Sequence, residues 1–342
     1  MQRSRIVLDA MGGDHGLAVP VEAAVRAASE RDIQVTLVGD ERLIASELRS
    51  LDYFSHSPDV IDAPESVSME DEAVAAVRRK RRASIPVGLE LVKSGRCDGF
   101  VSAGNTGAVV ASSVVSLGRL PGVSRPGIAI QIPTIDGPPM LLIDAGAITD
   151  PKPEFLWQHA RLANVYAKSA LGVEDPRIGL ISNGEEPGKG NLLTRQAHDL
   201  LSSDPGIRFI GNIEARAIPR GVCDVAVTDG FTGNVILKTS EGIVTLMQES
   251  LKTEFKRRVH TGVLAALLRP AFRRAGRALD YREYGGAPLL GVDGLVMIAH
   301  GSSDVTALTN ALIAADEAVR KGSVPAMREA LSARGESNVA GA

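Results

Sequence analysis

Residues 177–201 read RIGLISNGEEPGKGNLLTRQAHDLL, and this stretch indicates how the rest of the chain is built. Its first five residues form a short apolar run that is typical of a buried strand. A polar, glycine-rich loop follows at 182–191, and residues 192–201 carry the apolar spacing of a helix. A strand followed by a loop and a helix is the unit of parallel sheets that helices cover on both faces.

The same unit recurs along the chain. Five further runs predict strands that are each followed by a helix: 5–10, 34–39, 98–102, 224–228 and 294–299. We therefore predict an α/β fold, a three-layer αβα sandwich with a mostly parallel sheet. Residues 128–132 and 140–144, joined by a turn-rich link, predict one antiparallel hairpin. A further helix is predicted at 69–83, where an acidic start and a basic end match the helix dipole.

Polar loops follow most of the predicted strands. In sheets of this kind, ligands bind beyond the carboxyl ends of the strands, where such loops gather. The loops lie at 12–16, 102–107, 144–147, 183–191, 229–234 and 300–304. We expect them to line one shared cleft.

Length and composition limit the classes to which the protein can belong. A chain of 342 residues with 44% apolar and 23% charged residues can bury a large core. We expect a single αβα catalytic unit over residues 1–321 with a helical hairpin inserted at about 250–282, and a partly disordered tail at 322–342. The net charge of −3 and the 4% of aromatic residues argue against a nucleic-acid binder.

The N-terminus and the apolar runs predict a cytoplasmic protein. The first residues lead directly into a strand, without the apolar region of a signal peptide. No apolar run reaches the roughly 18–20 residues that a membrane span requires. The two cysteines, Cys97 and Cys223, stand in similar Gly-x-Cys-Asp contexts and are expected to be small buried hydrophobic residues.

The loop at 182–191 combines glycines, the lone lysine Lys189 and the N-terminus of the next helix. Free backbone N–H groups and the helix dipole favour an anion at such a place, so we expect a phosphate site. The loop is not a Walker A motif, because the spacing before Gly188 is one residue short and Gly190 occupies the place of the magnesium-binding Ser or Thr. Residues 11–16 also lack the dinucleotide-binding spacing.

No metal site and no covalent nucleophile are expected. The histidines are scattered, and neither an H-E-x-x-H motif nor a cysteine pair is present. A G-x-S-x-G elbow is also missing, which favours direct displacement on a bound electrophile. His15 and His300 each lie in a glycine-rich loop after a strand, so both a functional role and a packing role stay open for them.

Residues 252–282 carry a second informative pattern. Apolar residues are flanked by basic ones, and Pro270 interrupts the helical register. Such a segment suits either the surface of an anionic membrane or a dimer interface, and the two are compatible. The residues that we expect to contact a membrane are Val263, Leu264, Leu267, Leu268 and Phe272.

Six sequence blocks, taken together and in order, resemble the phosphate acyltransferase family of bacterial phospholipid synthesis, the acyl-ACP:phosphate transacylases. The blocks are DAMGGD at 9–14, SAGNTG at 102–107, GEE and GKG within 184–190, DGFTGN at 229–234, YGGAPLLG at 284–291 and AHGSSD at 299–304. The resemblance spans about residues 5–320. The chain departs from the family pattern at 182–183, at Ile148 in place of asparagine, and at Ala215 in place of glycine.

The resemblance implies a fold akin to the phosphotransacetylases and isocitrate dehydrogenases. It also implies a homodimer that contacts an anionic membrane peripherally. The implied reaction uses neither metal nor cofactor: phosphate attacks fatty acyl-ACP and gives acyl phosphate and free acyl carrier protein. The acyl phosphate would then feed a glycerol-3-phosphate acyltransferase.

Within that reaction, Lys189 is expected to neutralise phosphate, and Asn234 or Asn105 to donate to phosphate or the oxyanion. His15 or His300 is expected to protonate the departing thiol. Substrate-binding residues are expected in the same loops: Asp9, Gly12, Gly13, Asn105, Thr106, Gly188, Asp229, Thr232, Gly233 and Ser302. The alternative enzyme is a phosphotransacylase that acts on short acyl-CoA, and a related dehydrogenase ranks lower. A phosphate-binding membrane scaffold is the non-enzymatic alternative.

Overall fold

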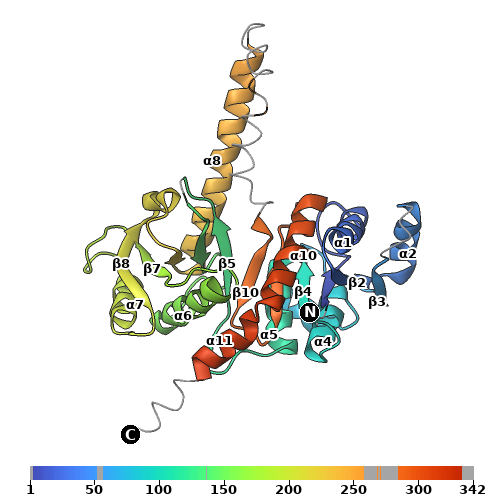
Figure 1. Cartoon of the computed structure of the whole chain (residues 1–342), viewed down its shortest axis with the longest axis horizontal. Coiled ribbons are helices and arrows are strands. Elements are labelled where there is room, and N and C mark those ends of the chain that lie inside the picture. Colours follow the sequence, from blue (N-terminus) through green and yellow to red (C-terminus); the bar gives the residue numbers. More distant parts are fainter. Residues whose placement is uncertain are drawn as a thin grey trace.

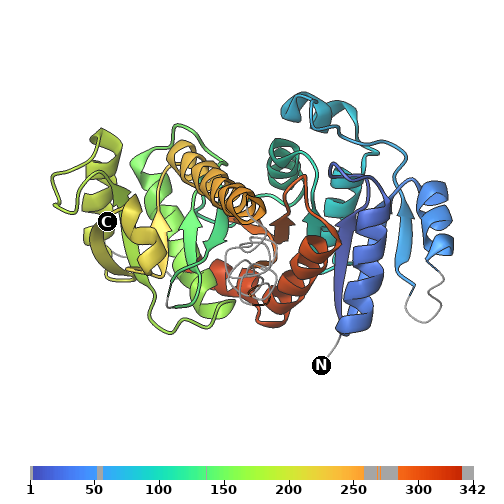
Figure 2. The same cartoon turned by 90° about the horizontal axis from the view of Figure 1, so that it is seen from above.

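The computed structural model describes residues 3–51, 57–135, 137–257 and 284–332, together with the isolated positions 268 and 270. In this part of the chain eleven strands form one sheet with helices on both faces, as Figure 1 and Figure 2 show. In spatial order the strands are β3 (Asp59–Asp62), β2 (Ile33–Gly39), β1 (Ser4–Asp9), β4 (Gly99–Ser102), β11 (Leu295–Ile298), β10 (Ala287–Leu290), β5 (Gly127–Ile132), β6 (Met140–Ile143), β9 (Val225–Val227), β7 (Arg177–Ser182) and β8 (Arg208–Glu214). The predicted α/β fold with a mostly parallel sheet is confirmed.

The sheet consists of two parallel parts that run in opposite directions. Half-sheet A contains β3, β2, β1, β4 and β11, which are mutually parallel. Half-sheet B contains β6, β9, β7 and β8, which are also mutually parallel. Between them, β10 and β5 pair antiparallel with each other and with their outer neighbours β11 and β6. The predicted β5–β6 hairpin is confirmed, whereas β10 was not predicted.

The inner strands of half-sheet A are buried on both faces. Ile6 and Leu8 of β1 pack in one apolar cluster, while the intervening Val7 packs in a second cluster with Phe100 of β4. The first cluster lies under α1 (Ala18–Glu30) and α10 (Val305–Arg320), and the second lies under α4 (Ser84–Lys93). Because successive strand residues point to opposite faces, a strand covered on both sides reads as a continuous apolar run. Each such side chain stabilises the fold by roughly 1.5–3 kcal/mol when fully buried.

The remaining helices complete the two outer layers. They are α2 (Glu41–Ser50), α3 (Ala73–Arg79), α5 (Thr106–Ser116), α6 (Pro153–Ser169), α7 (Leu192–Ser202) and α11 (Ser323–Ser332). The helix predicted at 69–83 was wrong in its bounds, since α3 covers only its middle. The Asp71 carboxylate accepts hydrogen bonds from Ser68 N–H at 2.7 Å and from Lys80 Nζ at 2.6 Å, which folds the acidic start into a turn instead.

The two half-sheets use the same ion pair where a central strand begins. In half-sheet A, Arg5 donates its backbone N–H to Asp98 Oδ2 at 2.8 Å and its Nη2 to Asp98 Oδ1 at 2.6 Å. In half-sheet B, Arg177 does the same to Asp224 at 2.8 and 2.9 Å. Burial raises the pKa of each carboxyl, but the hydrogen bonds and charge of the arginine outweigh burial, so both pKa values lie below the ordinary aspartate value. Each aspartate directly precedes a strand, β4 or β9, and therefore fixes the start of a parallel pair.

The helix α8 (Gly230–Lys256) projects away from the sheet, as the orange helix at the top of Figure 1 shows. Its exposed surface carries large apolar side chains: Phe231, Val235, Ile243, Leu246, Met247 and Leu251. Most of the hairpin insertion predicted at 250–282 lies outside the described residues, and α8 covers only its first residues, 250–256. In the predicted tail, α11 occupies 323–332, and residues 333–342 lie outside the described part. None of the described helices is long and apolar enough to cross a membrane.

Candidate active site

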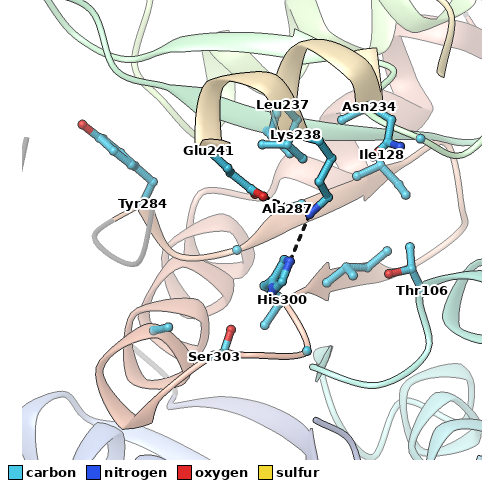
Figure 3. A pocket seen from close by; sticks show the side chains of 18 of the residues that line it. Thr106, Ile128, Asn234, Leu237, Lys238, Glu241, Tyr284, Ala287, His300 and Ser303 are labelled. Atoms are coloured by element: carbon cyan, nitrogen blue, oxygen red, sulfur yellow. Dashed lines mark hydrogen bonds and ion pairs between the residues drawn. The ribbon is translucent and has the colours of Figure 1, made fainter. Parts of the chain in front are cut away.

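A cavity of about 420 Å³ lies where the loops of the two half-sheets meet, and Figure 3 shows it from close by. Half-sheet A contributes the loops that follow β1, β4 and β11, through Asp14, Thr106 and His300. Half-sheet B contributes Gly146 after β6 and Asn234 at the start of α8. Five of the six loops expected in one cleft therefore line this cavity, whereas the loop at 183–191 does not.

The cavity wall combines apolar and charged surfaces. Its apolar side chains include Ile128, Ile130, Leu237 and Ile298. Its polar side chains include Asn234, Lys238, Glu241, His300 and Ser303. Figure 3 shows Lys238 and Glu241 reaching down from α8 toward His300 on the opposite side. A mainly apolar pocket with a few convergent polar groups is typical of a ligand site, and this one can hold an apolar chain beside a charged reacting group.

Lys238 and His300 make the central contact across the cavity. The Lys238 Nζ lies 3.1 Å from His300 Nε2 and 3.0 Å from a carboxylate oxygen of Glu241. On the other side of the ring, His300 Nδ1 lies 2.7 Å from Ser302 Oγ. His15, the other candidate histidine, donates from Nε2 to the Ser302 backbone carbonyl at 3.1 Å and does not line the cavity. Both histidines therefore contact Ser302, but only His300 faces the cavity.

The first turn of α8 positions Asn234. Asp229 is the helix N-cap and accepts hydrogen bonds from the Thr232 backbone N–H at 2.8 Å and from its hydroxyl at 2.7 Å. Gly233 lies against the loop after β6 so closely that an added Cβ would sit 1.9 Å from the Asp144 carbonyl oxygen. Only glycine permits this approach, which brings Asn234 beside Gly146. The structure thus gives Asp229, Thr232 and Gly233 a part in building the site.

The loops after β1 and β4 are held together by Asp9. This carboxyl is buried and accepts hydrogen bonds from Ser102 Oγ at 2.7 Å and from Met11 N–H at 3.0 Å. Burial raises its pKa above the ordinary aspartate value. A Cβ at Gly12 would lie 2.6 Å from the Gly104 nitrogen, and Gly13 has a φ of +97°. Neither Asp9 nor these two glycines line the cavity; they bring the two loops that border it into contact.

The Asn105 side chain, at the N-cap of α5, is bound within the chain. Its oxygen accepts a hydrogen bond from Ala108 N–H at 3.0 Å. Its amide nitrogen lies within 3.1–3.3 Å of the backbone carbonyl oxygens of Ser68, Met69 and Asp71. Asn105 therefore fixes the segment that carries Met69 into the cavity wall, and the neighbouring Thr106 lines the cavity directly.

A second buried aspartate, Asp144, organises the loop after β6. Its carboxylate accepts backbone hydrogen bonds from Ile128 at 3.1 Å, Gly146 at 3.0 Å, and Ala147 and Ile148 at 2.8 Å. Asp144 and Asp9 thus occupy comparable places, each following or ending a strand and each holding the next loop by backbone N–H groups. The loops that border the cavity on both sides are rigidly built.

Lys189 lies outside the wall of this cavity. The loop that carries it is held by Asn183, whose side-chain oxygen accepts a hydrogen bond from Gly190 N–H at 2.8 Å. The aliphatic part of Lys189 covers Gly184, where an added Cβ would lie 2.8 Å from its Cγ. Both Lys189 and Gly188 are exposed to solvent. The structure consequently does not bring Lys189 together with Asn234 and His300 around the cavity.

The two thiols are buried and free. Burial raises the pKa of the Cys97 thiol and raises that of Cys223 to about 12, so both stay protonated near neutral pH. Across the described ranges, no group of three or more His, Cys, Asp or Glu side chains is arranged to hold a metal ion. Of the residues predicted to contact a membrane, Leu268 is 51% exposed, and the others lie outside the described residues: Val263, Leu264, Leu267 and Phe272.

Lys238 is the residue that motif reading missed. The sequence motif ends at Asn234, and a helix was predicted to follow it. On a helix, a lysine four residues later lies on the same face as Asn234. Among the described residues that line the cavity, Lys238 is the only lysine or arginine. The i, i+4 spacing from Asn234 was the signal that could have identified it.

Comparisons with known proteins agree with this architecture. The model of a family described as "Fatty acid synthesis protein" matches residues 4–326. A phosphate acyltransferase of Halothermothrix orenii is 43% identical over 334 residues, which cover 97% of this chain and 100% of the relative. A phosphate acyltransferase of Nostoc sp. is 44% identical over 316 residues, with 92% of each chain covered.

Solved structures support the fold alone. A EutD phosphotransacetylase from Staphylococcus aureus superposes with a TM-score of 0.62 at 17% identity, covering 93% of this chain and 94% of the other. A phosphotransacetylase from Streptococcus pyogenes gives a TM-score of 0.61 at 19% identity, with the same coverage. The family match and the sequence relatives go further, and they agree with the six sequence blocks. This chain belongs to the phosphate acyltransferase family and is an acyltransferase.

Proposed function

We propose that this acyltransferase moves a fatty acyl group from acyl carrier protein to inorganic phosphate and releases an acyl phosphate. The observation that carries the proposal is one cavity in which an apolar wall faces Asn234, Lys238 and His300. The apolar wall suits the acyl chain, and the polar groups suit phosphate and the reacting thioester. In this proposal the reaction is the first step toward phosphatidic acid, and a glycerol-3-phosphate acyltransferase consumes the product.

Phosphate can attack without a general base, because it carries ionised oxygens at neutral pH. The site must hold this anion near the thioester and stabilise the second negative charge that develops on the carbonyl oxygen. Lys238 supplies positive charge, and the Asn234 amide supplies N–H donors without a charge of its own. No covalent intermediate on the enzyme is needed.

Lys189 and Gly188 remain proposed phosphate ligands beside this cluster. Their support is the pattern of a glycine-rich loop before a helix, which favours anions. Neither residue lines the cavity. Substituting Lys189 therefore tests the contribution of this loop to phosphate binding without changing Lys238.

The long helix α8 supports a proposed homodimer. It carries six large apolar side chains that are exposed in the single chain, and exposed apolar surface on this scale is typical of interaction sites. We propose that a second copy of the chain covers them, and that residues 263–272 contact an anionic membrane from the cytoplasmic side. Leu246→Glu with Met247→Glu should shift sedimentation velocity from dimer to monomer. Changing Leu264, Leu267 and Leu268 together to Glu should abolish co-sedimentation with anionic liposomes while the dimer persists.

The reaction itself is tested with the purified full-length chain. Acyl-ACP and inorganic phosphate are mixed, and the acyl phosphate is trapped with hydroxylamine and measured. Asn234→Ala should reduce turnover by roughly 10²-fold or more, the effect of losing one transition-state donor. Gln248→Ala is the matched control, since it removes a carboxamide from the exposed part of the same helix.

Three outcomes separate the alternatives. Phosphate-dependent turnover of acyl-ACP that exceeds turnover of short acyl-CoA supports the proposal. Faster turnover of acetyl-CoA than of acyl-ACP identifies a short-chain phosphotransacylase instead. Phosphate binding without turnover of either donor identifies a scaffold.

A further inference from the structure

The contacts of His300 in the cavity cannot all be satisfied in one protonation state. A neutral imidazole offers one donor nitrogen and one acceptor nitrogen. Lys238 approaches Nε2 at 3.1 Å, and the Ser302 backbone N–H approaches Nδ1 at 3.2 Å. If both donate, His300 must accept at both nitrogens, which a neutral ring cannot do. Only one of these two groups can therefore donate a hydrogen bond to the neutral ring.

The Ser302 hydroxyl fits either tautomer, so the Lys238 ammonium decides between them. The hydroxyl oxygen lies 2.7 Å from Nδ1 and can accept a hydrogen bond as readily as donate one. With the hydrogen on Nδ1, the ring donates to Ser302 Oγ, and the Nε2 lone pair accepts from the Lys238 ammonium. The other tautomer would place an N–H of the ring against a charged ammonium group. The geometry thus favours the Nδ1–H tautomer, in which the Nε2 lone pair faces the cavity.

We propose that Lys238 and His300 work as a coupled pair, in which bound phosphate draws Lys238 away from Nε2 and His300 then carries a proton from phosphate to the departing thiol. This inference rests on the proposed function and links the Lys238 contact with phosphate to proton transfer by His300. Lys238 already lies between a carboxylate, Glu241, and a neutral acceptor, His300. A phosphate dianion offers the ammonium a stronger partner than a neutral imidazole does.

The step is balanced in atoms and charge. An ionised oxygen of HPO4²⁻ forms the new C–O bond, and the C–S bond of the thioester breaks with its electron pair on sulfur. The remaining phosphate proton passes to His300 Nε2 and from there to the thiolate. The products are an acyl phosphate dianion and a neutral thiol, so the total charge of −2 is unchanged. Ser302 holds Nδ1–H throughout and stabilises the ring when it is briefly positive.

The experiment uses two acyl donors that differ only in the leaving thiol. One is a fatty acyl thioester of pantetheine, an alkyl thiol whose pKa of roughly 8.5 or above makes protonation helpful. The other is the same fatty acyl thioester of an aromatic thiol, which leaves readily as thiolate. Full-length protein is assayed with both donors over a range of inorganic phosphate concentrations.

His300→Gln should lower kcat by roughly 10²-fold with the pantetheine donor and by only a few-fold with the aromatic donor. Lys238→Met should raise the KM for phosphate by about tenfold or more with both donors. Lys252→Met is the matched control, because Lys252 lies on the same helix and also pairs with a glutamate three residues away, Glu249 at 3.1 Å, but does not line the cavity. This control should match the wild type.

Equal losses with the two donors in His300→Gln would overturn the proton path, and an unchanged KM for phosphate in Lys238→Met would overturn the role of Lys238. Nitrogen-15 NMR of the histidine rings gives a readout that is independent of turnover. It should show Nδ1 protonated and Nε2 unprotonated at His300 in the free protein, and the reverse tautomer would contradict the inference. If the wild type turns over neither donor with phosphate, the proposed function itself fails, an outcome that is distinct from a failure of the relay.

Discussion

Replacing Asn105 with alanine should destabilise the protein mainly by releasing the segment at 68–71. The side-chain oxygen caps α5 through Ala108 N–H, and such a cap contributes about 1 kcal/mol. The amide group has two hydrogens for its three carbonyl neighbours, so it makes at most two full hydrogen bonds. These bonds are partly exposed and add about 0.5 kcal/mol each, at the low end of the usual range. We expect a total loss of about 2 kcal/mol.

The assay is equilibrium unfolding of the full chain in urea. Asn105→Ser is the matched variant, since serine keeps a cap oxygen but has no amide donors, and it should lose only about 1 kcal/mol. Because Asn105 positions the cavity wall without reacting, kcat/KM should fall by less than about tenfold in Asn105→Ala, against roughly 10²-fold for a lost transition-state donor. Unchanged unfolding free energy combined with a loss of 10²-fold or more would refute this reasoning and assign Asn105 to the substrate.

Three further predictions follow from the same structure. Gly233→Ala should destabilise the fold by about 3 kcal/mol and abolish turnover, because its Cβ would overlap the Asp144 carbonyl oxygen; a correctly folded, active variant in thermal unfolding and turnover assays would contradict the close approach. The pKa values of Asp98 and Asp224 are lower in the folded protein than in the unfolded chain, so their ionised carboxylates stabilise the fold at pH values above roughly 4. This contribution should be lost as the pH falls through the pKa values of the folded state. Asp98→Asn and Asp224→Asn should each flatten the dependence of the unfolding free energy on pH between about 5 and 3, and an unchanged slope would count against the ion pairs. Lys189→Ala, assayed beside the Lys238 variant, should lower turnover by roughly 10²-fold if the loop supplies the phosphate ligand, and near-normal turnover would remove Lys189 from the site.

The fold was predictable because its main signals are local. The continuous apolar runs of the strands in half-sheet A and the glycine-rich loops after them appear in the sequence much as they do in the structure. The strand β10 was missed because it is four residues long, contains Pro288, and depends on partners from distant parts of the chain. The helix at 69–83 was overextended because its charge pattern suits a helix, while the contact between Asp71 and Lys80 favours a turn.

The site was predictable in its loops and less so in its side chains. Asn234 and His300 were expected and do line one cavity, since both follow strands whose ends meet there. Lys238 was not predicted because it lies beyond the loop motif, although helical spacing places it on the same face as Asn234, one turn later. The position of Lys189 relative to the cavity depends on how half-sheet B is joined to half-sheet A through β5 and β10. The sequence of the loop itself carries no information on that arrangement.

The place of β11 in the sheet also sets the order in which the molecule can be assembled. β4 ends at Ser102, but its neighbour β11 begins only at Leu295. Half-sheet A therefore cannot be completed until the last part of the chain has been synthesised. Half-sheet B lies wholly between Met140 and Val227, so all of its strands are synthesised before β11 becomes available to half-sheet A. Limited proteolysis of ribosome-bound chains stalled before Leu295 should therefore find all four strands of half-sheet B present, while half-sheet A still lacks β11 beside β4. A chain that stops there also lacks His300 and the loop after β11, so the proposed active-site cavity is complete only once the last part of the chain has been made.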